Sequence, residues 1–151
     1  EIINISENSV NYCLGCHSCE KTRQCVQNDD MMTIYKKLES ADIICVAAPS
    51  YWGYVPGQLK VFFDRSTPYC NTINNSTPFP HGKKGIAIAL RAGSSQKENL
   101  VVINAIEHYF SHLEIAPCFN ATFENIQNPE DMEKTAVTNT IRTIIEKLKE
   151  L

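Results

Sequence analysis

The sequence lacks the features that would assign it to several specialised classes of protein. Its 151 residues hold no apolar run near the roughly 20 residues of a membrane-spanning helix, and no charged-then-apolar leader. Positive charge is not in excess, because the formal net charge is −3, so neither nucleic acid nor an acidic membrane is an expected partner. Internal repeats, low-complexity tracts and linkers are also missing, so the whole chain, 1–151, is expected to form one domain.

What is present is the composition of an ordinary globular protein, with 43% hydrophobic and 21% charged residues. A chain of this length can bury a core without covalent cross-links. Because no leader is seen, we expect a cytoplasmic location and reduced thiols. The seven cysteines then favour metal binding or redox chemistry over a disulfide framework.

Apolar runs and helical periodicities alternate along the chain. Residues 42–49 are a continuous apolar run ended by proline, which is typical of a strand buried on both faces. Such alternation predicts βαβ units, a parallel sheet and an α/β sandwich. The expected strands are 1–5, 42–49, the first part of 84–95 and 114–123; the expected helices are 31–38, the second half of 50–65, 97–113 and 129–148, with a surface loop over 66–82.

Ligands of such a sheet bind outside the carboxyl ends of its strands. The loops expected there are 6–29, 49–56, 91–96 and 119–128. Two of them carry most of the chemistry: a cysteine-rich loop over 6–29, followed by Asp29 and Asp30 where a helix N-cap is expected, and a Tyr-Trp-Gly-Tyr turn after the second strand.

The cysteine-rich loop has the spacing C-x2-C-x2-C-x5-C. Four thiolates this close can surround one centre, and thiolate sulfur is a ligand of both iron–sulfur clusters and zinc. Zinc ribbons usually pair two C-x2-C units across a longer loop, whereas an unbroken run is more similar to the ferredoxin-type arrangement. The expected metal ligands are Cys13, Cys16, Cys19 and Cys25.

Other interpretations of these cysteines stay open on spacing alone. "CLGCH" matches the pattern of covalent haem attachment, which needs an export route and does not use a third cysteine. A thiol–disulfide exchanger normally opens a helix, but nothing periodic follows before Met31. The cysteines can also bind nothing in the purified protein. His17 is expected to be a loop residue rather than a ligand, and Cys45 a small apolar filler of a buried strand.

Three strings of the sequence together resemble one known family. "CLGCHSCEKTRQCVQNDDM", "ADIICVAAPSYWGYVPGQLKVFFDR" and "GKKGIAIALRAGS" are similar to the iron–sulfur flavoprotein branch of the NAD(P)H-dependent FMN reductases, and the resemblance runs from Glu1 to about Phe123. It implies a flavodoxin-like three-layer sandwich with a parallel sheet, FMN as cofactor, a four-iron cluster on the cysteines and NAD(P)H as co-substrate.

The resemblance also implies a flavin site. Pro49 to Gly53 would border the isoalloxazine ring, with Tyr51, Trp52 and Tyr54 as stacking faces, and the turn after the next strand would approach its other edge. The same aromatics can instead form a packing or dimerisation patch. The Asp64–Arg65 pair is expected to fix a helix end and a subunit contact, and no acid–base catalyst is nominated. The implied FMN-binding residues are Pro49, Ser50, Tyr51, Trp52, Gly53, Ala92, Gly93 and Ser94.

The chain departs from the family at its start. Relatives begin with a strand, a phosphate-binding loop and a helix, and the first strand expected here matches their second. The missing strand would be the central one, between 1–5 and 42–49, and the missing helix the first. We therefore expect this chain to be part of a longer protein, or to receive that strand from another chain.

These features predict a flavin-dependent oxidoreductase or electron-transfer flavoprotein. It would pass electrons from NAD(P)H or a protein donor through FMN to a small acceptor such as a quinone. The alternative is a non-enzymatic metal-binding or redox-sensing module on the same scaffold. A homodimer or higher homo-oligomer is expected, because flavin sites of this family are usually built near a subunit interface.

Overall fold

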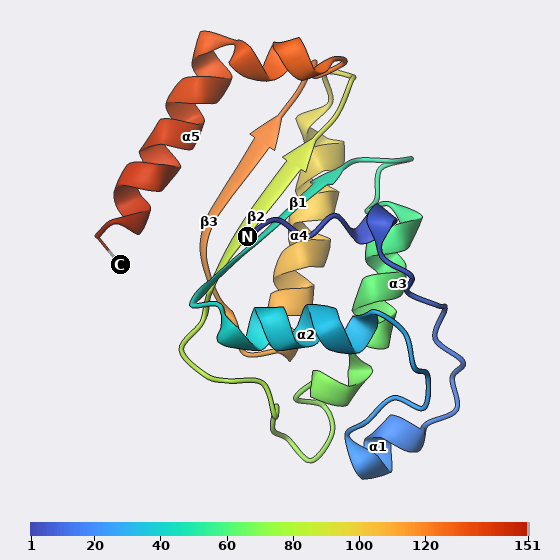
Figure 1. The fold of residues 1–151 in the computed structure, drawn as a ribbon. Coiled ribbons are helices and arrows are strands. Elements are labelled where there is room, and N and C mark those ends of the chain that lie inside the picture. Colours follow the sequence, from blue (N-terminus) through green and yellow to red (C-terminus); the bar gives the residue numbers. More distant parts are fainter. Residues whose placement is uncertain (151) are drawn as a thin grey trace.

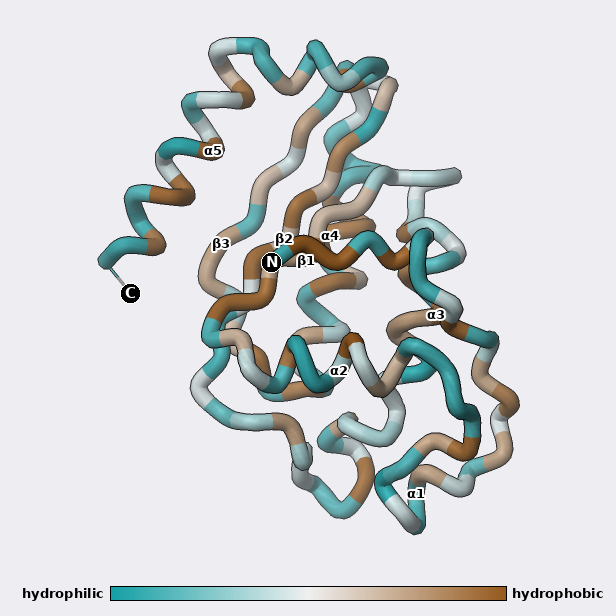
Figure 2. The backbone as a smooth tube through the Cα atoms, viewed as in Figure 1, coloured by the Kyte–Doolittle hydropathy of each residue, from teal (hydrophilic) through white to brown (hydrophobic). Residues whose placement is uncertain are grey.

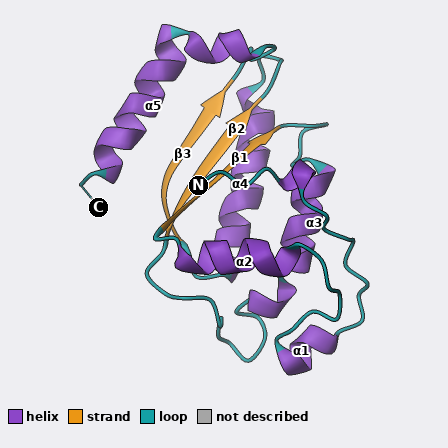
Figure 3. Ribbon diagram, in the orientation of Figure 1, coloured by secondary structure: helices purple, strands orange, loops and turns teal. Residues whose placement is uncertain are grey.

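The computed structural model describes residues 1–150, which fold around a parallel three-stranded sheet of order β1-β2-β3 (Figures 1 and 3). The strands are β1 (Ile43–Pro49), β2 (Lys84–Leu90) and β3 (Ala116–Phe123). Pro49 lies opposite Leu90, and Leu90 lies opposite Phe123, so the carboxyl ends of the strands are level. The helices are α1 (Ser18–Thr22), α2 (Met31–Ser40), α3 (Gly57–Arg65), α4 (Gln96–His112) and α5 (Thr135–Leu148), with short 3-10 turns at Ile5–Glu7, Thr67–Tyr69 and Pro129–Glu133.

Helix α4 covers one face of the sheet, and α2 and α3 lie beside it and share its main core (Figure 1). Their apolar faces meet Ile44 and Ala48 of β1 in one cluster of buried residues. The periodic residues that predicted α2 account for this, since Met31, Ile34 and Tyr35 are all buried. Helix α5 packs beside β3 with a smaller cluster that includes Ala121 and Val137, and it lies apart from the other helices in Figure 1. The three layers expected from the sequence are therefore present.

The expected strand over residues 1–5 is not formed. These residues are irregular and run into the 3-10 turn at Ile5. A strand needs a neighbour for its N–H and C=O groups, and within residues 1–150 the sheet consists of β1, β2 and β3 without these residues. Ile3 and Ile5 instead pack against the main core, and a cavity of about 330 Å³ lies between this segment and β1. Figure 2 shows the apolar start of the chain crossing beside β1.

Two further expectations about burial were wrong. Strand β1 is not buried on both faces, because Ile43, Cys45 and Ala47 are exposed on the side opposite Ile44 and Ala48. Cys45 is therefore not an enclosed apolar filler. Segment 66–82 is not only a surface loop either: Phe79 is 1% exposed, because its ring packs edge-on against Tyr35 and Tyr69.

No helix within residues 1–150 is both long enough and apolar enough to cross a bilayer.

Candidate cofactor site

The aromatic turn closes tightly just after β1. Tyr51 and Tyr54 exchange backbone hydrogen bonds of 2.9 and 3.1 Å, which leaves Trp52 and Gly53 as the two central residues of a hairpin turn. Both have positive φ, 53° and 72°, as a type I′ turn requires. Glycine adopts this conformation without strain, but a tryptophan does not. The Trp52 side chain is fully exposed, so its ring gains no packing in return.

The second turn lies beside the first. The Ser50 N–H donates to the Leu90 carbonyl at 2.8 Å, which fastens the end of β1 to the end of β2. Arg91 pairs with Glu98 at 2.6 Å, and a Cβ on Gly53 would lie 3.6 Å from the Glu98 Cγ. The aromatic turn therefore sits against the start of α4, next to residues 91–95. This brings together the two segments that sequence analysis nominated for flavin binding.

Unpartnered polar groups gather where these turns meet. The Ser50 hydroxyl is buried without a hydrogen-bond partner. Among residues 1–150 the backbone N–H groups of Ala92, Gly93 and Ser94 also donate no hydrogen bond. Buried polar groups are normally paired, so an orphaned hydroxyl beside free N–H donors suits the polar edge of a flat ligand. An exposed indole at the same edge suits the apolar face of that ligand, and these residues fit an isoalloxazine ring.

The four cysteines of the loop line one small cavity of about 140 Å³, together with Leu14 and Val26. Burial and the neighbouring thiols Cys25, Cys13 and Cys16 raise the pKa of Cys19, whereas backbone and side-chain hydrogen bonds from Ser18 lower the pKa of Cys16. The thiols are free of disulfides. In the part of the chain that the structure describes, no three His, Cys, Asp or Glu side chains converge tightly enough to enclose a metal ion.

A buried ion pair anchors the cysteine loop to the fold. Arg65 donates to both carboxylate oxygens of Asp29, at 2.7 and 3.0 Å, and to the Asn11 carbonyl. Both side chains of the pair are almost fully buried. The two neighbours have different partners: Asp64 pairs with Lys60 at 2.5 Å on the exposed face of α3, while Arg65 turns inward.

The protonation of this pair follows from its contacts. Burial alone would raise the pKa of Asp29, but hydrogen bonds from Arg65 and from the N–H groups of Asn11 and Met31 outweigh it, and the pKa falls to about 2. Burial would lower the pKa of Arg65, yet its bonds to Asp29 and the nearby Cys25 thiol raise it overall. Both groups are therefore ionised, and the Asp29 carboxylate balances the Arg65 charge. Asp30 is the N-cap residue of α2, but its side chain makes no capping hydrogen bond and instead accepts from the Ser9 N–H at 2.8 Å. The Asp29 carboxylate accepts from the Met31 N–H at 3.2 Å.

Arg23 provides a second anchor. Its guanidinium donates to the carbonyls of Pro68, Cys70, Ile73 and Ser76 and so ties the cysteine loop to segment 68–76. The fork-like shape of arginine allows such multiple bonds. Sequence analysis missed both anchors, because their partners lie 36 to 53 residues away along the chain.

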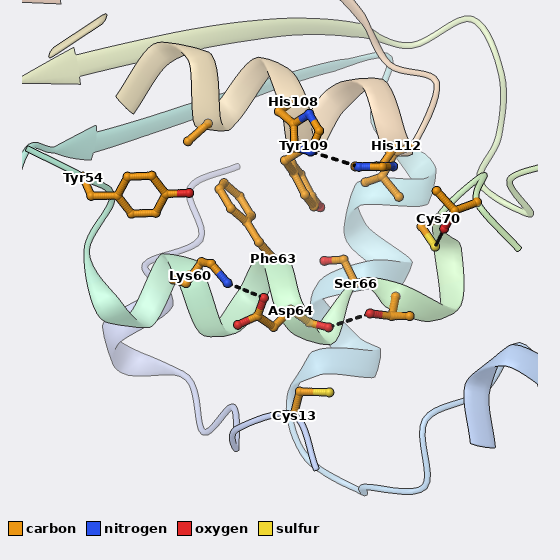
Figure 4. A pocket seen from close by; sticks show the side chains of 14 residues that line it. Cys13, Tyr54, Lys60, Phe63, Asp64, Ser66, Cys70, His108, Tyr109 and His112 are labelled. Carbon is orange, nitrogen blue, oxygen red and sulfur yellow. Dashed lines mark hydrogen bonds and ion pairs between the residues drawn. The ribbon is translucent and has the colours of Figure 1, made fainter. Parts of the chain in front are cut away.

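A cavity of about 600 Å³ lies between α3 and α4. Tyr54 of the aromatic turn and Cys13 of the cysteine loop both line it, as Figure 4 shows. Phe63 and Tyr109 stack in its wall with ring centres 4.3 Å apart. His108 and His112 of α4 line it as well, and sequence analysis singled out neither.

Curated relatives resemble this chain over much of its length. An iron–sulfur flavoprotein of Archaeoglobus fulgidus is 36% identical over 100 residues, a match that covers 66% of this chain and 43% of that protein. Another of Methanocaldococcus jannaschii is 32% identical over 122 residues, covering 80% of this chain and 59% of that protein. The chain thus spans about half the length of these relatives.

A solved structure confirms the fold. The FMN-dependent NADH-azoreductase of Bacillus anthracis, in complex with FMN, superposes with a TM-score of 0.67 at 14% identity, over 98% of this chain and 79% of that one. A flavodoxin of Agrobacterium tumefaciens also matches, with a TM-score of 0.50, so the flavodoxin-like α/β fold expected from the sequence is present. The family model of the NADPH-dependent FMN reductases matches residues 1–127. Most of the chain is thereby accounted for, and it belongs to the NADPH-dependent FMN reductase family.

Proposed function

We infer that this chain is the flavin-facing and cysteine-bearing part of an oxidoreductase. It would take electrons from NAD(P)H or a protein donor and pass them to a small acceptor such as a quinone. Oxidation of NAD(P)H releases two electrons and one proton. Reduction of a quinone to the quinol consumes two electrons and two protons, the second proton coming from water. FMN, when bound, supplies this hydride and electron chemistry.

One observation carries the proposal: Trp52 is held in a strained positive-φ conformation and is fully exposed at the carboxyl edge of the sheet. Strain of this kind persists where function needs it. An exposed indole next to the unpartnered Ser50 hydroxyl offers a stacking face and a polar contact to one flat ligand. The residues that would hold the ring are those nominated from the sequence, Pro49–Gly53 and Ala92–Ser94.

The cysteines support a second redox centre. Cys13, Cys16, Cys19 and Cys25 line one cavity, and two relatives of this chain are iron–sulfur flavoproteins by name. A four-iron cluster held there would exchange single electrons. Cys13 of the cysteine loop and Tyr54 of the aromatic turn line the same cavity, which supports electron exchange between the two centres.

Titration of the purified chain with riboflavin and FMN tests the flavin site. Riboflavin carries the ring without the phosphate, so it isolates the contacts of the two turns. We expect both to bind, and Trp52→Ala to weaken each about tenfold or more, in the range measured for stacked aromatics. Tyr12→Ala removes another exposed aromatic, outside the turns, and should leave binding unchanged. Equal effects of the two variants, or no binding by the wild-type chain, would refute the site.

Anaerobic purification tests the second centre. Iron and sulfide should be present at about four of each per chain, as a four-iron cluster requires, and disappear when the four cysteines are changed to serine, while riboflavin binding persists. A flavin-free protein that holds zinc on the same cysteines would instead favour the alternative, a non-enzymatic metal-binding or redox-sensing module. Oxidation rates with NADH and NADPH, and light scattering for the proposed homodimer, complete the assignment.

A further inference from the structure

We propose that His108 and His112 form a binding site for a divalent first-row transition metal ion of the nickel, copper and zinc class. The site would be separate from the four cysteines of the loop and would not depend on them. It uses two imidazole nitrogens as protein ligands, with water in the remaining positions. Neutral imidazole nitrogen suits this class of metal ion.

The two histidines already converge. They are four residues apart on α4, so their side chains lie on the same face of the helix. Their Nε2 atoms are 3.1 Å apart, and the two ring planes meet at 84°. Metal–imidazole bonds of about 2.0–2.1 Å hold two nitrogens about 2.9 Å apart at a right angle and about 3.3 Å apart at a tetrahedral angle. The observed separation lies within this range.

Asn71 sets the protonation of one of these rings. Its amide nitrogen donates to the Ser111 carbonyl at 3.1 Å, so its oxygen is the atom that faces His112. The His112 Nδ1 lies 3.4 Å from that oxygen and carries the proton of this weak hydrogen bond. The His112 Nε2 is then left with a lone pair directed at His108. A second ring nitrogen bound to a carbonyl oxygen is the usual support of a metal-ligating histidine.

The support is itself rigid. The Asn71 N–H donates to the His112 carbonyl at 2.8 Å, so this residue is fastened to the end of α4 by backbone and side chain together. His112 is half-buried and His108 exposed, and both line the 600 Å³ cavity, which has room for metal-bound water. Figure 4 shows the Lys60–Asp64 pair on the opposite wall, where the two charges neutralise each other.

A hydrogen bond between the two rings would give a similar nitrogen separation, so metal binding must be measured. Titration calorimetry with Ni²⁺ is carried out on the full chain without an affinity tag. All proteins carry serine at Cys13, Cys16, Cys19 and Cys25, so that thiolates do not compete. We expect one ion per chain, and the variant H108Q/H112Q should raise the dissociation constant about tenfold or more, a change of about 1.4 kcal/mol.

The matched control uses the other half of the chain's four histidines. The variant H17Q/H81Q removes the same number of imidazoles from exposed sites and should leave the Ni²⁺ affinity unchanged. Equal losses in the two double variants would overturn the proposal, as would undiminished binding by H108Q/H112Q. Thermal unfolding followed by circular dichroism confirms that each variant is folded.

A second measurement keeps the proposal testable in the wild-type chain if the serine background does not fold. Nitrogen-15 labelling of histidine gives only four pairs of imidazole signals. Substoichiometric Ni²⁺ should broaden the signals of His108 and His112 together while those of His81 stay sharp. If an equimolar addition leaves the His108 and His112 signals sharp, the pair does not bind the metal.

Discussion

At the scale of single residues, Trp52 adopts a positive-φ backbone conformation that a residue with a bulky side chain disfavours. A type I′ turn favours Asn-Gly, and here the first central position holds the bulkiest side chain available. The neighbouring Gly53 satisfies the turn, so the strain resides in one residue. The ring makes no packing contact that would offset it, since it is fully exposed. Stability and ligand contact should therefore respond in opposite directions when this residue is changed.

We predict that Trp52→Gly raises the free energy of unfolding by up to about 1 kcal/mol, because glycine removes the left-handed strain but adds some freedom to the unfolded chain. Riboflavin affinity should fall in the same variant. Urea unfolding and flavin titration measure the two effects. Trp52→Ala is the control: it removes the ring but keeps a Cβ at positive φ, so it should weaken binding without raising stability. A stabilised Trp52→Ala would contradict the strain argument.

Asp29 is the other residue whose environment has a measurable effect, because it makes the free energy of unfolding depend on pH. Its pKa of about 2 lies below the ordinary value of 3.8, so the folded state binds the proton more weakly than the unfolded state does. A depressed carboxyl pKa contributes stability above the ordinary pKa, and that contribution is lost as pH falls through the folded value. This stabilisation is therefore lost between about pH 4 and pH 2.

We predict that acid in this window removes on the order of 2 kcal/mol through Asp29, since each pKa unit corresponds to about 1.4 kcal/mol. Urea unfolding of the wild-type chain at a series of pH values measures the slope. Asp29→Asn should be less stable at pH 7 and show a shallower acid slope, while Asp64→Asn, which alters an exposed ion pair, should follow the wild type. Identical slopes for wild type and Asp29→Asn would show that another carboxyl is responsible.

At the scale of elements, β2 and α4 pack closely at Gly85. A Cβ placed on Gly85 would come within 2.6 Å of the Phe110 ring and 3.1 Å of Ile115. Phe110 is fully buried, so its ring has no free space to move into. The helix can lie this close to the central strand only because the strand has no side chain at this point.

We predict that Gly85→Ala lowers the free energy of unfolding by about 1–3 kcal/mol, the usual cost of overpacking a core. Gly57→Ala is the matched control, since a Cβ there meets no atom within 4 Å and Gly57 begins α3. That variant should be unchanged or slightly more stable. Denaturant unfolding of both compares them directly, and a neutral Gly85→Ala would mean that α4 shifts without cost.

Strands β1, β2 and β3 were predictable because each is an apolar run ended by a turn. Residues 1–5 have the same apolar pattern, but a strand forms only when it pairs with a neighbouring strand. The hydrophobic pattern does not show whether such a neighbour is available. Phe79 was placed on the surface because proline and asparagine surround it, yet its ring packs edge-on against the stacked rings of Tyr35 and Tyr69.

The part of the candidate site whose position follows from the sheet topology could be predicted from the sequence. Parallel strands bring their carboxyl ends to one edge, so Pro49–Gly53 and Ala92–Ser94 had to lie close together. The Asp29–Arg65 pair was not predictable, because Arg65 has Asp64 beside it in sequence and only the packing of α3 decides which way it turns. The His108–His112 spacing was visible in the sequence, but the fit of Asn71 against it was not.

At the scale of the whole molecule, the two faces of the sheet are unequally stabilised. Helix α4 buries six residues, five of them in the main core, whereas α5 buries only Val137 among its described side chains. Local opening costs less where less apolar surface is buried. The last helix should therefore open independently of the remainder of the domain.

We predict that amide hydrogens of α5 exchange with solvent well before those of α4. Hydrogen exchange followed by mass spectrometry should show peptides from 135–148 reaching full exchange while peptides from 96–112 remain protected. Val137→Ala should speed exchange in α5 and leave α4 unchanged, because the two helices belong to separate clusters. Simultaneous exchange of both helices would indicate a single cooperative unit.

The exposed turn at Trp52 also gives the protein an intrinsic fluorescence probe. Trp52 is the chain's single tryptophan, so all indole fluorescence comes from the edge where the flavin is proposed to bind. A fully solvated indole emits at long wavelength, and a flavin stacked on it would quench this fluorescence. Occupancy of the site, its kinetics and its competition with other flat molecules could thus be followed in the native chain without a label.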